Sequence, residues 1–173
     1  MTTIATGGTV NTGVTTRTYD AAGTAGWTAG HGIEVNGVCF DSGGNVYTCG
    51  NYVTIDTVRV AVRAYDGAGN LLWNGSHRTT LRAIARHPDG IVTAGASIDG
   101  ANIKLFALDG TLTWARSYLG GGTIRGVAAD SAGNVYVCGV RTGSITTAKY
   151  DSSGTLVWSA DHGLTVYGIA IDS

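Results

Sequence analysis

Four tryptophans recur along the chain at nearly constant intervals, and no other feature of the sequence constrains the fold as strongly. They are Trp27, Trp73, Trp114 and Trp158, and the intervals between them are 46, 41 and 44 residues. Each tryptophan ends a related phrase, in the forms YDAAGTAGW, YDGAGNLLW, LDGTLTW and YDSSGTLVW. The chain of 173 residues is therefore built from four copies of one unit.

Each repeat is expected to form four short β-strands. A second phrase stands upstream of three of the tryptophans, as FDSGGNVYTCG, RHPDGIVTAG and ADSAGNVYVCG. In both phrases a turn joins two alternating runs, because the Asp side chain accepts hydrogen bonds and the Gly supplies a positive φ. In the second repeat the predicted strands are Val35–Phe40, Asn45–Cys49, Val60–Tyr65 and Leu71–Ser76. Four antiparallel strands recurring about every 40–45 residues are typical of β-propeller blades.

The two ends of the sequence complement each other. A shift of 131 residues places the C-terminal TVYGIAIDS on EVNGVCFDS, residues 34–42. The N-terminal residues are thus expected to supply three outer strands of one blade, and roughly Thr165–Ile171 its inner strand. We predict an all-β fold, a single β-propeller domain over 1–173 with four four-stranded blades, at 1–32 plus 164–173, 33–77, 78–120 and 121–163. Pairing of the N- and C-terminal strands would close the ring and remove two exposed sheet edges.

The sequence leaves two ways of closing the ring. One chain can close alone as a four-bladed propeller, or two chains can each give four blades to an eight-bladed homodimer. Four blades bring the inner strands close to the axis and need small residues there. One equivalent inner-strand position carries only small residues, namely Gly37, Ala83, Gly126 and Gly168. This favours closure within one chain, with the dimer as the alternative.

Two motifs resemble those of the bacterial β-propeller repeat family, whose blades carry D-x-x-G-N-x-Y and a later K-Y-D-x-x-G-x-L-x-W. They are DSAGNVYVCG at Asp130–Gly139 and KYDSSGTLVW at Lys149–Trp158. The third repeat matches in part, with shorter turns at Asp89-Gly90 and Asp109-Gly110, and Met1–Gly8 departs from the pattern. The resemblance implies a propeller architecture. It implies no catalytic residue, because family members are mostly uncharacterised surface, secreted or phage-encoded proteins.

Charge and hydropathy exclude several classes of partner and location. Charged residues make up 13% of the chain, about half the usual share, and the net charge is −1. We therefore expect neither a nucleic-acid nor a membrane partner. The N-terminal MTTIATGGTV has no basic and apolar regions of a secretory signal, and no apolar run approaches the ~20 residues of a spanning helix. A virion or the cytoplasm is favoured over secretion.

The acidic residues do not form a catalytic pattern. Eight of the twelve carboxylates are assigned to hairpin turns: Asp20, Asp41, Asp66, Asp89, Asp109, Asp130, Asp151 and Asp172. No two of the remaining four form an evident acid/base pair, and no serine stands in a nucleophile elbow. Cys39, Cys49 and Cys138 are expected to be free thiols, and His87, in a tight turn beside Pro88, is expected to be inert. We predict a protein that is not an enzyme, with no cofactor, metal or catalytic residues.

Two sets of equivalent residues are candidate binding sites. His31, His77, Tyr118 and His162 each stand four residues after a repeat tryptophan, and a ring of loop residues could arise if all four connections face one side. Local packing or hydrogen bonding is the favoured interpretation of these four. Asn36, Arg82, Arg125 and Tyr167 are large polar residues at one inner-strand position, where they could hold an anion or sugar hydroxyls at the channel. Filling of the channel with water-bridged hydrogen bonds is the favoured alternative.

Two functions follow from these patterns. The first is a non-catalytic structural or interaction propeller with protein partners or self-association, such as a tail or decoration component of a phage virion. The second is a lectin-like, carbohydrate-binding propeller that uses the axial residues or grooves beside the tryptophans. The tryptophans themselves are expected to pack one blade on the next.

Overall fold

Every regular element that the structure describes is a β-strand. The computed structural model describes residues 3–8, 16–30, 34–54, 57–77, 79–97, 103–118, 122–141, 144–162 and 166–172. All strand pairs within these ranges are antiparallel, and the chain forms two compact units, Met1–His77 and Arg78–Ser173. No helix long and apolar enough to cross a membrane occurs in these residues. The prediction of an all-β chain is confirmed.

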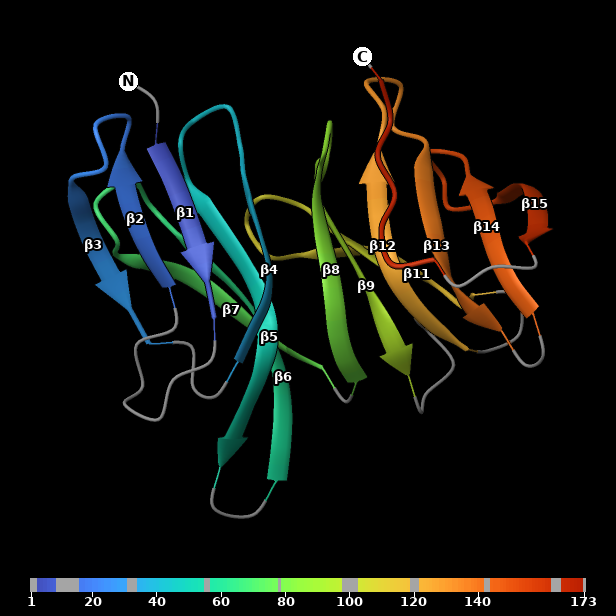
Figure 1. Ribbon diagram of the computed structural model, residues 1–173, viewed down its shortest axis with the longest axis horizontal. Helices are drawn as coiled ribbons and strands as arrows, with labels where there is room; N and C mark the ends of the chain where they lie inside the picture. Colours follow the sequence, from blue (N-terminus) through green and yellow to red (C-terminus); the bar gives the residue numbers. More distant parts are fainter. Residues whose placement is uncertain are drawn as a thin grey trace. The chain divides into compact units, whose positions relative to one another are not determined.

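The first unit contains a three-stranded and a four-stranded sheet (Figure 1). The three-stranded sheet has the order β1-β2-β3, with strands Thr3–Gly7, Thr16–Asp20 and Ala25–Ala29. The four-stranded sheet has the order β4-β5-β6-β7, with strands Glu34–Phe40, Val46–Thr54, Thr57–Tyr65 and Leu71–His77. The second repeat therefore forms its four strands where the sequence predicts them.

The second unit contains the third and fourth repeats in one eight-stranded sheet. The third repeat forms β8 to β11, at Thr79–His87, Gly90–Ser97, Ile103–Phe106 and Leu112–Arg116. The fourth forms β12 to β15, at Thr123–Ala129, Val135–Arg141, Ser144–Tyr150 and Leu156–His162. The two four-stranded meanders are joined by a single pair between β9 and β12, Ala96 opposite Thr123.

Residues 166–172 do not form the inner strand that the sequence predicts for Thr165–Ile171. Thr165 lies outside the described residues, and 166–172 have no strand assignment. They run beside β12 (Figure 1), where a Cβ added to Gly126 would lie 3.0 Å from the Ile169 nitrogen and 3.1 Å from the Gly168 Cα. A strand exists only when a neighbouring strand completes its hydrogen bonds. The expected neighbour, β1, is paired with β2 alone among the described strands.

Five hairpins share one turn, in which an Asp side chain organises the backbone. Asp130 shows the pattern: its Oδ1 accepts from the N–H groups of Ala132 and Asn134, and its carbonyl accepts from the Gly133 N–H. Gly133 has φ +80°, a conformation that favours glycine. The same hydrogen bonds or the same positive φ recur in the turns at Asp20, Asp41, Asp66 and Asp151. The assignment of these five residues to turns is confirmed.

The other three assigned carboxylates differ in their structural role. Asp109 occupies the third position of a similar turn that begins at Ala107, and its carboxylate accepts from the backbone N–H and from the side chain of Thr111. Asp89 lies in a tighter turn between β8 and β9. Asp172 was expected in a hairpin turn that follows an inner strand. It lies at the end of the 166–172 segment, which has no strand assignment, so the strand before the turn is missing. The hairpin prediction therefore fails for Asp172.

Hydrogen bonds hold the pKa of six turn carboxyls below its ordinary value, namely those of Asp20, Asp41, Asp66, Asp109, Asp130 and Asp151. For Asp130 the largest contribution is the Asn134 side-chain amide, burial opposes it, and the Asn134 backbone N–H and Tyr136 hydroxyl lower the pKa further. For Asp66 the Asn70 side chain contributes most. Because the folded-state pKa lies below the unfolded value near 3.8, the charged turns stabilise the fold above that pH. This stabilisation is lost as the pH falls through the folded-state pKa.

Asp41→Ala tests whether the first turn position contributes to stability. Asp41 accepts from the Asn45 backbone and side chain and from the hydroxyl of the buried Tyr47, so the variant removes three hydrogen bonds. We expect a Tm lower by about 5 °C in thermal unfolding. The matched variant Asp109→Ala removes hydrogen bonds only from the exposed Thr111 and is expected to lower the Tm by less than half as much. Equal effects of the two substitutions would contradict this role.

Candidate functional site

Within each unit a tryptophan of one repeat packs on a hairpin turn of the next repeat. Trp27 of β3 donates its indole N–H to the Gly67 carbonyl at 3.2 Å, and Trp114 of β11 donates to the Ser152 carbonyl at 3.1 Å. Both acceptors directly follow the first Asp of an equivalent turn. A Cβ added to Gly69 or Gly154 in these turns would lie 2.7 Å or 3.0 Å from the indole ring. The predicted packing role is confirmed for these two tryptophans.

Arg116 strengthens the junction between the third and fourth repeats. Its guanidinium donates to the carbonyls of Gly154 and Ser153, both at 3.0 Å, and lies 5.7 Å from the centroid of the Trp114 ring. The arginine therefore binds the same turn that the tryptophan covers. A planar group with several fixed donors suits a turn that exposes several carbonyls.

His87 is a buried contact between the third and fourth repeats, not the inert turn residue that the sequence suggested. Its side chain is fully buried, and Nδ1 accepts from the Asp89 N–H at 3.0 Å. That bond places the proton on Nε2, which donates to the Gly133 carbonyl at 2.9 Å. His87 stands where the other repeats carry the first Asp of the turn. Its ring replaces the carboxylate as acceptor and adds a donor that reaches the neighbouring repeat.

The predicted loop set is only partly described. His31 lies outside the described residues, and the structure does not describe the side chain of His77. Tyr118 is fully buried, and its hydroxyl donates to the Thr146 carbonyl in β14, while burial raises its pKa to about 12. His162 is exposed on β15, with Nε2 2.9 Å from the Thr147 hydroxyl. Tyr118 and His162 thus make local contacts.

Two of the four predicted axial residues meet in the second unit. The Arg125 guanidinium lies 5.0 Å from the centroid of the Tyr167 ring, and Tyr167 is 74% exposed. Arg82 is exposed on β8. Asn36 lies on β4 in the first unit, where it helps to line a cavity of about 120 Å³. Of the four residues, Arg125 of β12 and Tyr167 of the 166–172 segment therefore form a cation–π pair.

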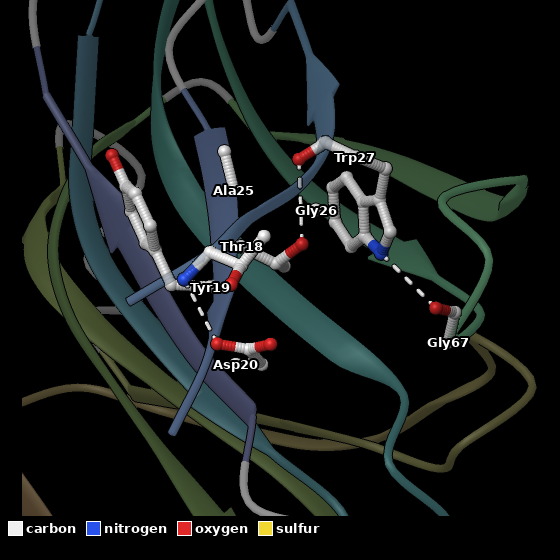
Figure 2. Close-up of a pocket in the computed structure, with 8 residues that line it drawn as sticks. Thr18, Tyr19, Asp20, Ala25, Gly26, Trp27 and Gly67 are labelled. Atoms are coloured by element: carbon white, nitrogen blue, oxygen red, sulfur yellow. Dashed lines mark hydrogen bonds between the residues drawn. The ribbon is translucent and has the colours of Figure 1, made fainter. Parts of the chain in front are cut away.

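A larger cavity of about 270 Å³ lies in the first unit beside Trp27 (Figure 2). Its lining residues are Thr18, Tyr19, Asp20, Thr24, Ala25, Gly26, Trp27 and Gly67. Asp20 is charged near neutral pH, because the Thr24 backbone N–H, more than any other group, lowers its pKa. An indole, a carboxylate and hydroxyl groups converge here, a combination that suits a small polyhydroxylated ligand.

Small side chains at two positions of β3 leave room for this cavity. Ala25 and Gly26 stand where the second and fourth repeats carry Leu71-Leu72 and Leu156-Val157. Thr18 lines the cavity from β2, at the position that Ala64, Leu105 and Lys149 hold in the other repeats. The Thr18 hydroxyl leaves no space for a side chain at Gly26 of β3, because a Cβ added to Gly26 would lie 2.6 Å from its oxygen. The first repeat therefore departs from the others at the place where the cavity lies.

The structure contains the three cysteines as free thiols. Burial raises the pKa of Cys49 far above its ordinary value and raises that of Cys138 as well, so both thiols remain protonated and unreactive. Among the side chains that the structure describes, no three His, Cys, Asp or Glu residues gather as metal ligands would.

Solved structures identify the architecture. The chain is similar to the nidogen YWTD propeller of a nidogen/laminin complex, with 17% identity, a TM-score of 0.67, and coverage of 99% of this chain and 66% of that one. It is also similar to BamB from Moraxella catarrhalis, with 15% identity, a TM-score of 0.62, and coverage of 95% and 52%. Both are β-propeller proteins. The fold is of the β-propeller type.

The chain is shorter than the propeller chains that it resembles. The chain spans about two thirds of the nidogen chain and about half of the BamB chain. No protein-family model and no curated protein matches the sequence. Membership of the bacterial propeller repeat family therefore stays a prediction, as do the rings of candidate site residues.

His87→Ala tests the buried junction. The variant leaves a cavity and removes the donor to the Gly133 carbonyl, and we expect the free energy of unfolding to fall by about 2–4 kcal/mol in urea denaturation. The control His162→Ala changes an exposed imidazole and is expected to stay within about 0.5 kcal/mol of the unaltered protein. A His87→Ala effect as small as that of the control would show that the contact contributes nothing.

Proposed function

We propose that this protein is a non-catalytic interaction propeller. The proposal rests on one observation: the polar side chains that a catalytic site would require are engaged in hydrogen bonds that stabilise the fold. Turn carboxylates such as Asp41 and Asp130 hold backbone amides, and the His87 imidazole and the Tyr118 hydroxyl are buried in hydrogen bonds to backbone carbonyls. Groups fixed in this way support a scaffold, and its outer surface is left for partners.

Proteins are the partners that we propose. The nidogen structure is a complex with laminin, which illustrates how a propeller serves as a platform for another protein. A weakly charged surface and a self-contained repeat fit a component of a larger assembly, and we propose a virion tail or decoration protein. We further propose that four four-stranded blades form a ring closed by the N- and C-terminal strands, within one chain or between two.

The cavity beside Trp27 favours a second function, carbohydrate binding. Its indole, its charged carboxylate and its hydroxyl groups offer one apolar surface and several hydrogen-bonding groups to a sugar. This cavity lies beside one of the repeat tryptophans, where the lectin-like alternative expects a sugar to bind. In this version the propeller would be a binding module for glycans, still without catalysis.

Co-sedimentation of the chain with virus particles tests the first function. A tagged chain produced in a phage-infected host culture is expected to sediment with particles far heavier than itself in a density gradient, and to be released by denaturant. A chain found only at its own mass in the soluble fraction, while the particles lack it, would overturn the virion role.

A glycan array, read with one cavity-filling variant, tests the second function. Ala25→Leu restores the residue that three other repeats carry, so the fold should persist while the cavity is filled. A glycan that binds the unaltered protein and loses at least ten-fold in affinity with Ala25→Leu would place the site beside Trp27. Leu72→Ala on the exposed β7 is the control and should bind as before. An array with no signal above background would rule this function out.

A further inference from the structure

The structure describes the tryptophan-on-turn interface once within each unit, and one further half of it is exposed in each unit: Trp158 in the second and the turn at Asp20–Thr24 in the first. Trp158 of β15 is equivalent to Trp27 and Trp114, yet it is 43% exposed, whereas Trp114 is 8% exposed. Its described ring contact lies within its own sheet, to Tyr136 at 6.5 Å between centroids. The last tryptophan therefore presents the donor half of the interface to solvent.

The acceptor half is open at the other end of the chain. The turn at Asp20–Thr24 has the geometry of the turns that receive Trp27 and Trp114, including a φ of +82° at Gly23. Nothing lies within 4 Å of a Cβ added to Gly23, whereas the indole rings lie within 3.0 Å of one added to Gly69 or Gly154. Ala21, the residue after the first Asp, supplies the carbonyl equivalent to those of Gly67 and Ser152.

The sheet beside this turn also lacks a strand. The other three repeats form four strands, but the order β1-β2-β3 ends at β1. This strand is paired with no second strand in the described ranges, although β4 contacts its end, where the Val35 N–H donates to the Gly8 carbonyl at 3.2 Å. Ile4 of β1 is 48% exposed, whereas Val135, its equivalent in the fourth repeat, is fully buried. An unpaired edge with an exposed apolar side chain is a template for strand addition.

Residues 166–172 match the missing strand in sequence and in exposure. Their sequence repeats that of β4, and they already lie against β12 in the position of the next inner strand. Ile171 is 36% exposed, and Tyr167 is 74% exposed. In the fourth repeat Ala128 pairs with Tyr136, and Ala129 pairs with Val135. The same register would place Ala170 opposite Ala5, and Ile171 opposite Ile4.

We propose that a second copy of this chain covers both surfaces, with residues 166–172 and Trp158 of each copy docking on β1 and the Asp20–Thr24 turn of the other. This inference rests on the proposed ring and names its partner. A two-fold axis then repeats one junction twice and completes both three-stranded sheets, so that the edge of β1 is paired in both copies. Eight blades result, which lies within the usual range for propellers.

The axial residues favour a second copy over closure within one chain. Arg82 and Arg125 lie on neighbouring inner strands of the second unit, and Tyr167 follows on the next segment. A four-bladed ring would crowd two guanidinium groups and further large side chains at its narrow axis, while a ring of eight blades provides a wider, hydrated channel.

Solution mass distinguishes the two closures. Light scattering is expected to give about 35 kDa, twice the 17.7 kDa of one chain. A mass of about 18 kDa at all concentrations would overturn the proposal in favour of closure within one chain. Trp158→Ala should raise the dimer dissociation constant at least ten-fold, while Leu72→Ala, on another exposed outer strand, should leave it unchanged.

Disulfide trapping tests the register and the identity of the partner. Ala5→Cys and Ala170→Cys chains, expressed separately and mixed, are expected to form a disulfide-linked dimer under mild oxidation. Ile4→Cys mixed with Ala170→Cys places the thiols on opposite faces and should not, and the unaltered protein controls for its native thiols. A disulfide formed only within a chain carrying both substitutions, or none in either mixture, would overturn the proposal. These readouts report assembly alone, so the interaction role can fail or stand independently.

Discussion

The contact between a tryptophan and the next repeat's hairpin turn is the constraint on which the rest of this structure depends. It needs an indole at the end of one repeat, and a turn that exposes a carbonyl and contains no Cβ at its fourth position in the next. Trp27 with Gly67 and Gly69, and Trp114 with Ser152 and Gly154, meet both requirements. The period of the tryptophans, the spacing of the Asp residues and the choice of glycine are three consequences of one interface.

Local hydrogen bonding made most of the fold predictable from the sequence. The Asp-x-x-Gly pattern specifies a turn by itself, because the side chain and the backbone that it holds are five residues or fewer apart. The strands of the second repeat follow from it. Contacts between repeats were harder to predict: His87 looked like an isolated turn residue, and only its position in the repeat, at the place of Asp41 and Asp130, could have indicated its role. Residues 166–172 were predicted as a strand from sequence equivalence, but a strand also needs a partner edge.

Departures from the repeat mark the places where function is to be sought. The fourfold pattern assigns most carboxylates to turns and most glycines to close packing. A residue that follows the pattern therefore has a structural role. Ala25 and Gly26 break the pattern, and a cavity follows that could be recognised in the sequence only by comparing the repeats position by position. The candidate rings were predicted from equivalence alone. Of these residues, the structure brings together Arg125 and Tyr167.

Hydrogen exchange of the indole N–H groups, followed by NMR, tests most directly whether the interface of Trp27 and Trp114 is formed again by Trp158. If Trp158 occupies the same kind of junction as Trp27 and Trp114, all three indole protons exchange slowly at high protein concentration, and Trp158 alone becomes fast on dilution. A Trp158 indole proton that exchanges as rapidly as free indole at every concentration would contradict a third such junction.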